Sequence, residues 1–105
     1  MCGIIGVFNS PDSEKIVKSG LKVIQNRGKD ASKITKLEPG CLGHNLHAII
    51  DLVKQPIKED NNYIVANCEI YNWEELNKKH NLNAKNDAEL LLKLINKKGI
   101  NNIKE

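Results

Sequence analysis

Aromatic residues are scarce in this chain, and their scarcity limits how its interior can be built. Phe, Trp and Tyr make up 4% of the 105 residues, whereas hydrophobic residues of all kinds make up 40%. The interior is therefore expected to consist mainly of Ile, Leu and Val. A chain of this length is expected to form at most one small domain.

Cysteine is also rare, and its spacing argues against common cysteine-based frameworks. Cys2, Cys41 and Cys68 are odd in number and widely separated, without a Cys-x-x-Cys pair. We therefore expect neither a disulfide framework nor a zinc site, and we predict no metal ligands.

Long apolar runs and blocks of like charge are missing as well. No apolar run reaches the length of a membrane-spanning helix, and the first residues lack the charged lead of a signal peptide. A cytoplasmic location without membrane association is therefore expected. The 16 basic and 13 acidic residues leave a net charge of +3, with the lysines interspersed among Asn, Asp and Glu. This pattern gives little support to nucleic-acid binding.

What the chain does contain is an alternation of strand-like and helix-like segments. An apolar run over residues 3–8 predicts a first strand, and the apolar spacing after it predicts a helix to about residue 25. A turn at 38–40 precedes a predicted strand over 41–50, in which Ile49 and Ile50 are the most apolar residues. Residues 54–62 are interpreted as a polar connection.

The second half begins with one more predicted strand and is then helical. Residues 63–66 have strong strand propensity and continue into the segment that ends at Asn72. Asn72 is expected to cap a helix over residues 73–79, with Glu75 closing a capping box. Asn86 or Asp87 caps a second helix, which Gly99 ends. The predicted fold class is therefore α+β or layered α/β.

Cys2 is the residue with the clearest chemical potential. Removal of Met1 would leave a thiol and a free α-amine on one residue, and a nucleophile that carries its own base is an established form of activated nucleophile. The structural alternative is that Cys2 is a small apolar residue at the start of a strand.

Four further short segments also contain residues that could carry chemistry. Each has an ordinary structural explanation by itself, such as a helix stop for Arg27 and Gly28, or a helix cap for Asp87. The segments, with Cys2, are Met1-Cys2-Gly3-Ile4, Asn26-Arg27-Gly28-Lys29-Asp30, Leu42-Gly43-His44-Asn45 with Ile49-Ile50-Asp51 and Gln55-Pro56, Asn67-Cys68-Glu69-Ile70-Tyr71-Asn72, and Asn86-Asp87-Ala88-Glu89.

In this order the segments resemble the class II glutamine amidotransferases, and above all the glutaminase domain of asparagine synthetases. That family shows a Cys-Gly-Ile start, an Arg-Gly-Pro-Asp loop, a Leu-Gly-His segment and an Asn-Gly-Glu-Ile-Tyr-Asn strand end. The resemblance implies an N-terminal-nucleophile (Ntn) hydrolase fold, a sandwich of two sheets between helix layers. It also implies that residues 1–105 are a partial domain, ending before the second half of the sandwich.

The resemblance implies a role for each matching residue. Cys2 corresponds to the nucleophile that attacks the side-chain amide of glutamine. Asn67 and the backbone N–H of Cys68 correspond to the oxyanion hole, while Glu69 and Asp87 correspond to substrate-binding acids. Arg27, Gly28 and Asp30 correspond to the loop that closes over the substrate. ATP and magnesium are expected only in a synthetase domain absent from this chain, so no cofactor is predicted here.

Two positions depart from the family pattern. Leu46 stands where an arginine normally holds the substrate α-carboxylate, so a bidentate charged contact is lost. His47 follows it, but adjacent strand residues face opposite sides, so His47 replaces the arginine only if the strand shifts or bulges. Cys68 stands in place of a glycine, which keeps the N–H but adds a side chain.

Three interpretations therefore stay open from the sequence. The first is a glutaminase-type domain that supplies ammonia and is incomplete alone. The second is a degenerate half-domain that acts as a binding or regulatory module, completed by a partner chain or by self-association. The third is a small α+β domain in which Cys2 only packs.

Overall fold

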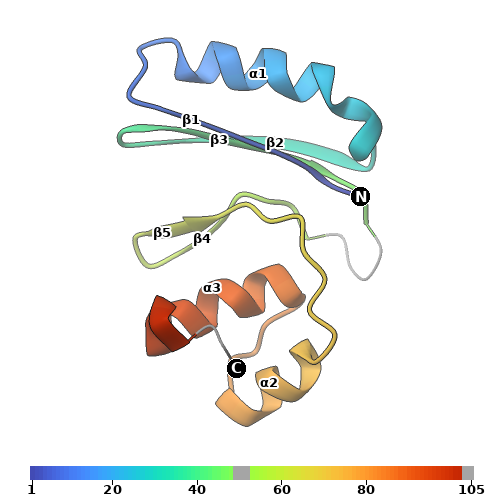
Figure 1. Ribbon diagram of the computed structural model, residues 1–105, viewed down its shortest axis with the longest axis vertical. Helices are drawn as coiled ribbons and strands as arrows, with labels where there is room; N and C mark the ends of the chain where they lie inside the picture. Colours follow the sequence, from blue (N-terminus) through green and yellow to red (C-terminus); the bar gives the residue numbers. More distant parts are fainter. Residues whose placement is uncertain (49–52, 103–105) are drawn as a thin grey trace. The chain divides into compact units, whose positions relative to one another are not determined.

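The computed structural model describes residues 1–48 and 53–102 (Figure 1). Its helices and antiparallel strands confirm the α+β class. The chain divides into two compact units, which are described separately: residues 1–56 with 65–67, and residues 57–64 with 68–105. The elements in chain order are β1 (Gly3–Phe8), α1 (Ser13–Val23), the 3-10 helix η1 (Gln25–Arg27), β2 (Ala31–Leu37), β3 (Gly40–Leu46), β4 (Ile57–Glu59), β5 (Asn62–Ile64), α2 (Trp73–His80), α3 (Asp87–Lys98) and the 3-10 helix η2 (Ile100–Asn102).

The first unit is an antiparallel sheet in the order β1-β3-β2 with α1 packed along one face (Figure 1). Val17 and Leu21 are four residues apart, so they lie on one side of α1, and both are buried against Cys41. Ile5 and Val7 alternate along β1 and pack against the same cluster. This interior is aliphatic, as the scarcity of aromatic residues predicts.

Strand β3 lies at the centre of this sheet, and all seven of its residues are buried. Helix α1 approaches the strand closely at Gly43, where an added Cβ would lie 2.6 Å from the side chain of Val17. Residues Cys41, Gly43 and Asn45 face α1, so His44 and Leu46 lie on the opposite face. The regular pairing of Gly3 with Asn45 brings the start of β1 to the end of β3.

The second unit contains the β4–β5 hairpin and two helices. Its core consists of Leu76, Ala84 and Leu90, against which Trp73 and Ile70 pack. Helix α3 is tied to the hairpin through polar groups near its C-terminal half. Those contacts are Lys93 Nζ to Glu59 Oε1 at 2.6 Å, Asn96 Nδ2 to the Glu59 carbonyl at 3.3 Å, and Asn62 Nδ2 to Asn96 Oδ1 at 2.7 Å.

The first strand and the helices agree with the sequence predictions, but the middle of the chain differs. The strand predicted over 41–50 runs from Gly40 to Leu46, and Ile49, Ile50 and Asp51 lie outside the described residues. The predicted connection over 54–62 is wrong, because it contains β4. The strand predicted over 63–66 ends at Ile64, since β5 pairs only with the three residues of β4.

The helix ends are partly as predicted. Asn86 caps α3 by accepting the N–H of Glu89 at 2.9 Å, and Gly99 follows the helix with φ 82°. Asn72 precedes α2 but makes no side-chain capping hydrogen bond, so the capping box with Glu75 is not formed. Helix α2 ends instead at Asn81 in the left-handed conformation, a geometry that Asn tolerates.

Candidate active site

The Cys2 thiol lies at the end of β3, in contact with the backbone of His47. The His47 N–H donates to Cys2 Sγ at 3.4 Å, and the thiol faces the His47 carbonyl oxygen at 3.7 Å. The antiparallel register causes this contact, because Gly3 pairs with Asn45 and the residues beyond them continue side by side. Cys2 is half-buried, so its sulfur is held in place while access from solvent remains.

Arg27 also contacts Cys2, through the Cys2 backbone. Its Nε donates to the backbone carbonyl oxygen of Cys2 at 3.0 Å. Arg27 is the last residue of η1, which turns the chain after α1. The turn at the helix end therefore brings the Arg27 guanidinium to the backbone of Cys2.

Gly28 lets the loop after η1 lie directly on β3. An added Cβ would be 2.5 Å from the carbonyl oxygen of Asn45 and 2.7 Å from the carbonyl carbon of Leu46. Its φ of −161° is ordinary extended backbone. The requirement at Gly28 is thus for close approach of two backbones, not for an unusual conformation.

Asp30 completes the contact between this loop and the end of β3. Its N–H donates to the Leu46 carbonyl at 2.9 Å, and its Oδ2 accepts the N–H of Ala48 at 2.7 Å. The same Oδ2 lies 3.9 Å from His47 Nδ1. The structure thus places Arg27 on Cys2 itself, and Gly28 and Asp30 on the end of β3 that the Cys2 thiol also contacts.

Leu46 and His47 differ sharply in exposure. Leu46 is 5% exposed and lies inside β3, whereas the His47 side chain is 52% exposed just beyond the strand. Strand β3 pairs regularly with β1 and β2 up to Leu46. The described strands therefore contain no bulge that would place His47 where Leu46 lies. A leucine at this buried position supplies no charge for a substrate carboxylate, and its assignment to the substrate site stays a prediction.

Asn67 belongs to the first unit and is exposed. Nearby, the Ala66 N–H donates to Gln55 Oε1 at 2.6 Å, which anchors the segment before Asn67 within the unit. Within residues 1–48 and 53–102, the Asn67 side chain makes no hydrogen bond to Cys2. Its proposed place in an oxyanion hole stays a prediction.

Cys68, Glu69 and Asp87 belong to the second unit. Asp87, in the first turn of α3, accepts the N–H of Ile70 through Oδ2 at 3.1 Å and that of Ala88 through Oδ1 at 2.9 Å. The backbone next to Glu69 is therefore tied to Asp87, so the two predicted substrate-binding acids lie close in this unit. Cys68 and Glu69 are exposed.

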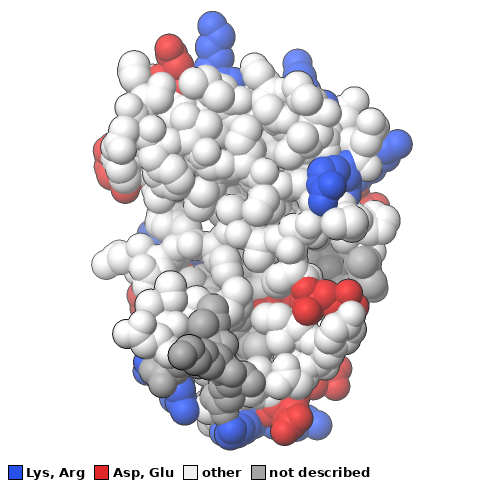
Figure 2. All heavy atoms as spheres, viewed as in Figure 1, with Lys and Arg blue, Asp and Glu red and all other residues white. Residues whose placement is uncertain are grey.

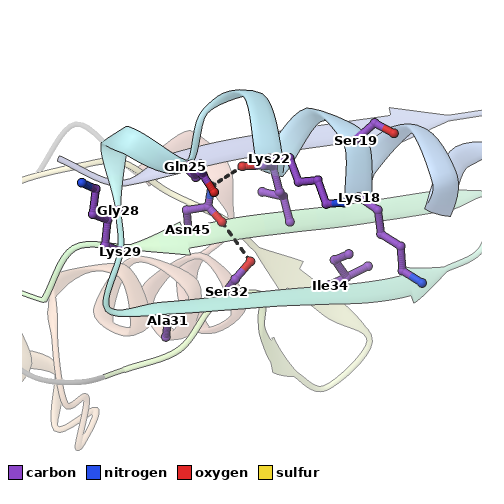
Figure 3. Close-up of a pocket in the computed structure, with 11 residues that line it drawn as sticks. Lys18, Ser19, Lys22, Gln25, Gly28, Lys29, Ala31, Ser32, Ile34 and Asn45 are labelled. Carbon is purple, nitrogen blue, oxygen red and sulfur yellow. Dashed lines mark hydrogen bonds between the residues drawn. The ribbon is translucent and has the colours of Figure 1, made fainter.

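Two residues of β3 make contributions that the sequence alone did not indicate. The buried Asn45 donates from Nδ2 to the Leu21 carbonyl at 2.9 Å and accepts from Ser32 Oγ at 2.9 Å, which links α1, β3 and β2 (Figure 3).

His44 is 1% exposed, and within the described ranges neither of its ring nitrogens has a hydrogen-bond partner. Burial lowers the pKa of His44, and the Ala66 backbone opposes this shift in part.

A cavity of about 680 Å³ lies between α1 and β2 (Figure 3). Lys18, Lys22 and Lys29 stand at its border, and Gly28 and Asn45 also line it, but Cys2 does not. The polar atoms of Asn45 inside it are already bonded within the unit. This hollow is therefore separate from the thiol, and we assign the candidate active site to the Cys2 end of the sheet.

A basic patch, a membrane-spanning helix or a metal site would each indicate another kind of function. On the face shown in Figure 2, Lys and Arg side chains are dispersed and do not form one basic patch. The described part of the chain contains no helix long and apolar enough to span a membrane. Across the same residues, no three His, Cys, Asp or Glu side chains come together as a metal site.

Comparison with known proteins identifies the family of this chain. The chain belongs to the family described as glutamine amidotransferase domain, which matches residues 1–105. It is 37% identical to the "Probable asparagine synthetase (glutamine-hydrolyzing)" of Acanthamoeba polyphaga mimivirus, over 94% of this chain and 20% of that protein. It is 34% identical to the "Putative asparagine synthetase (glutamine-hydrolyzing) 2" of Methanocaldococcus jannaschii, over 100% of this chain and 26% of that protein. The chain thus spans about a fifth to a quarter of these relatives.

Proposed function

We propose that this chain is a glutaminase domain of asparagine synthetase type, in which Cys2 attacks the side-chain amide of glutamine. The observation that carries the proposal is the position of the Cys2 thiol. It is held by the His47 N–H at 3.4 Å, with Arg27 on the Cys2 carbonyl at 3.0 Å, in a chain of the glutamine amidotransferase family.

The proposed reaction begins once Met1 is removed and Cys2 carries a free α-amine. The amine accepts the thiol proton, Sγ bonds to the amide carbon, and a tetrahedral oxyanion forms. Asn67 and the N–H of Cys68 are proposed to stabilise that charge; one such donor is typically worth about 2.7–4 kcal/mol. The C–N bond then breaks, the nitrogen leaves as ammonia with the thiol proton, and water hydrolyses the thioester to glutamate.

Glu69 and Asp87 are proposed to bind the α-ammonium end of glutamine. The support for Asp87 is its position in the first turn of α3, where its carboxylate also holds the N–H of Ile70 beside Glu69. The ammonia produced would serve an asparagine-synthetase-type reaction. ATP and magnesium belong in this proposal to a synthetase part of the relatives that this chain does not span.

The nucleophile is tested by mass spectrometry with diazo-oxonorleucine, an electrophilic glutamine analogue. We expect a Met1-free chain to gain one adduct at Cys2, and C2A to gain none at that residue. C68A is the matched control, because it removes an exposed thiol of the same chain and should keep the adduct. Labelling confined to Cys41 or Cys68, or a chain that retains Met1 and is not labelled, would refute the proposal.

A second function is favoured by Leu46. It is buried where the family resemblance expects an arginine, so the chain lacks that grip on the substrate carboxylate. A domain that has lost this grip would act as a binding or regulatory module. Competition by free glutamine separates the two functions: protection of Cys2 from the analogue supports the glutaminase, and its absence at saturating glutamine supports the module.

A further inference from the structure

The segment before Asn67 is fixed by a buried side chain to which the glutaminase proposal gives no role. Gln55 is 4% exposed, and its Oε1 accepts the N–H of Ala66 at 2.6 Å. Residues 65–67 pack with the first unit, although the hairpin strands that precede them along the chain belong to the second. Gln55 therefore ties the segment that carries Asn67 to the unit that contains Cys2.

Gln55 is itself held on the sheet of the first unit. The next residue, Pro56, is buried, and its carbonyl oxygen accepts a hydrogen bond from Lys33 Nζ at 3.1 Å. Lys33 lies on β2, opposite His44 of the central strand. The contacts thus run from β2 through Pro56 and Gln55 to the peptide before Asn67.

This arrangement lies on the face of the sheet opposite α1. Ile4 pairs with His44, and paired residues share a face. Burial lowers the pKa of His44 and the Ala66 backbone opposes this shift, which places Ala66 beside the His44 ring. Cys2 stands two residues before Ile4, so the alternation of side chains along the strand predicts the same face for its thiol. One face of the sheet thus serves both the thiol and the segment before Asn67.

We propose that Gln55 is a positioning residue for Asn67, the side chain proposed to stabilise the oxyanion. The inference rests on the proposed function, because only a reaction at Cys2 gives Asn67 an oxyanion to bind. Gln55 acts through the backbone of Ala66 and has no contact with the substrate in this proposal. The α-amine of Cys2 remains the base.

The physical reason is that an oxyanion donor is effective only when it is fixed in advance. A displacement of about 1 Å can cost about a hundredfold in rate. Asn67 is exposed, so the hydrogen bond on the neighbouring residue has to hold its backbone. A neutral amide suits this task, because Oε1 accepts the N–H and no buried charge needs a partner.

The test measures how fast diazo-oxonorleucine captures Cys2 in the full chain without Met1, as a function of the concentration of the analogue. Gln55→Met keeps the length of the side chain but lacks the oxygen that accepts the Ala66 N–H. We expect its maximal capture rate to fall about tenfold, since the reacting carbonyl loses a well-placed donor. The concentration for half-maximal rate should change little, because Asn67 acts in the transition state. Gln55→Glu keeps an oxygen at the same reach and should stay closer to the wild type.

Three further measurements separate positioning from loss of structure. Alkylation of Cys2 by iodoacetamide forms no oxyanion, so its rate should be the same in wild type and Gln55→Met. Ser32→Ala is the matched control, because it removes a hydrogen bond to Asn45 on the α1 face of the same sheet and should leave capture unchanged. Hydrogen exchange of the Ala66 N–H should become faster in Gln55→Met and stay the same in Ser32→Ala.

Circular dichroism checks that each variant folds. If Gln55→Met does not fold, Lys33→Met decides, because it removes the contact that holds Pro56. A lower maximal capture rate with unchanged iodoacetamide alkylation supports the inference. An unchanged maximal rate in the folded variant, or an equal loss of both reactivities, would overturn it.

Failure of the proposed function has a different signature. Diazo-oxonorleucine would then not label Cys2 even in the wild type, while exchange of the Ala66 N–H would still depend on Gln55. That outcome removes the oxyanion role of Asn67 and, with it, the inference.

Discussion

The guanidinium Nε of Arg27 donates a hydrogen bond to the carbonyl oxygen of Cys2 at 3.0 Å. The two residues are 25 positions apart, and the contact forms because η1 turns the chain back over the start of β1. A structural hydrogen bond thus connects the loop to the residue proposed as nucleophile. Removal of this hydrogen bond should lower both the stability of the folded chain and the reactivity of the Cys2 thiol.

Arg27→Leu should lower the free energy of unfolding by about 1 kcal/mol, the usual size of one such hydrogen bond, and should slow capture of Cys2 by diazo-oxonorleucine. Arg27→Lys keeps the charge but lacks Nε, so it should restore little of the effect. Urea denaturation and adduct formation over time measure the two quantities. An unchanged capture rate in Arg27→Leu would show that the contact is structural alone.

Gly28→Ala should destabilise the first unit by roughly 1–3 kcal/mol, as overpacking does elsewhere. The new Cβ would meet the Asn45 carbonyl oxygen at 2.5 Å, and that oxygen belongs to the central strand and cannot move easily. Gly20→Ala is the matched control, because its Cβ would meet only the flexible end of the Ile5 side chain. Thermal melting curves should therefore show a larger loss for Gly28→Ala, and equal losses would contradict this account.

Asn45→Asp should cost about 2–4 kcal/mol, because it replaces a buried donor to the Leu21 carbonyl with an acceptor. Ser32→Ala removes only the hydroxyl that donates to Asn45 and should cost about 1 kcal/mol. Urea titrations of both variants test the order. If Ser32→Ala were the more damaging change, the link between α1 and β3 would not be the important one.

His44 should make the stability of the protein sensitive to mild acid. Burial lowers the pKa of His44 in the folded chain, so the unfolded chain binds more protons once the pH falls below its reference pKa of about 6.5. Stability is then lost as the pH falls from about 6.5 towards the folded pKa, with a slope of at most about 1.4 kcal/mol per pH unit.

His44→Leu removes this titration and should flatten the loss of stability between about pH 7 and pH 5.5. Unfolding in urea at several pH values, for wild type and variant, measures the slopes. Glu14 is the carboxylate to consider at lower pH, since Lys36 and Lys18 lower its pKa. Identical slopes in the two proteins down to pH 5.5 would rule out His44 as the cause.

Local patterns predicted the elements that depend on local physics. The β1 run, the apolar face of α1 at Val17 and Leu21, and the Asn86 cap of α3 all appear in the structure as expected. Strand β4 was missed because it has only three residues and pairs only with β5 across Asp60, whereas the strand predicted over 63–66 overlaps β5 at Tyr63 and Ile64. With Lys58 and Glu59 as two of its three residues, β4 gave no apolar periodicity from which to recognise it.

For the site, the order of motifs along the chain indicated the family and predicted roles for Cys2, Arg27, Gly28 and Asp30, and those roles stay predictions. Nothing in that order could show that Gly28 lies against the backbone of Asn45, or that the His47 N–H reaches the thiol. These contacts depend on the antiparallel register of β1 with β3, which forms only when the sheet is assembled. Composition and motif order therefore determined which residue types this protein has for its chemistry, and the tertiary structure decided which of them meet, because strand pairing joins residues distant in the chain.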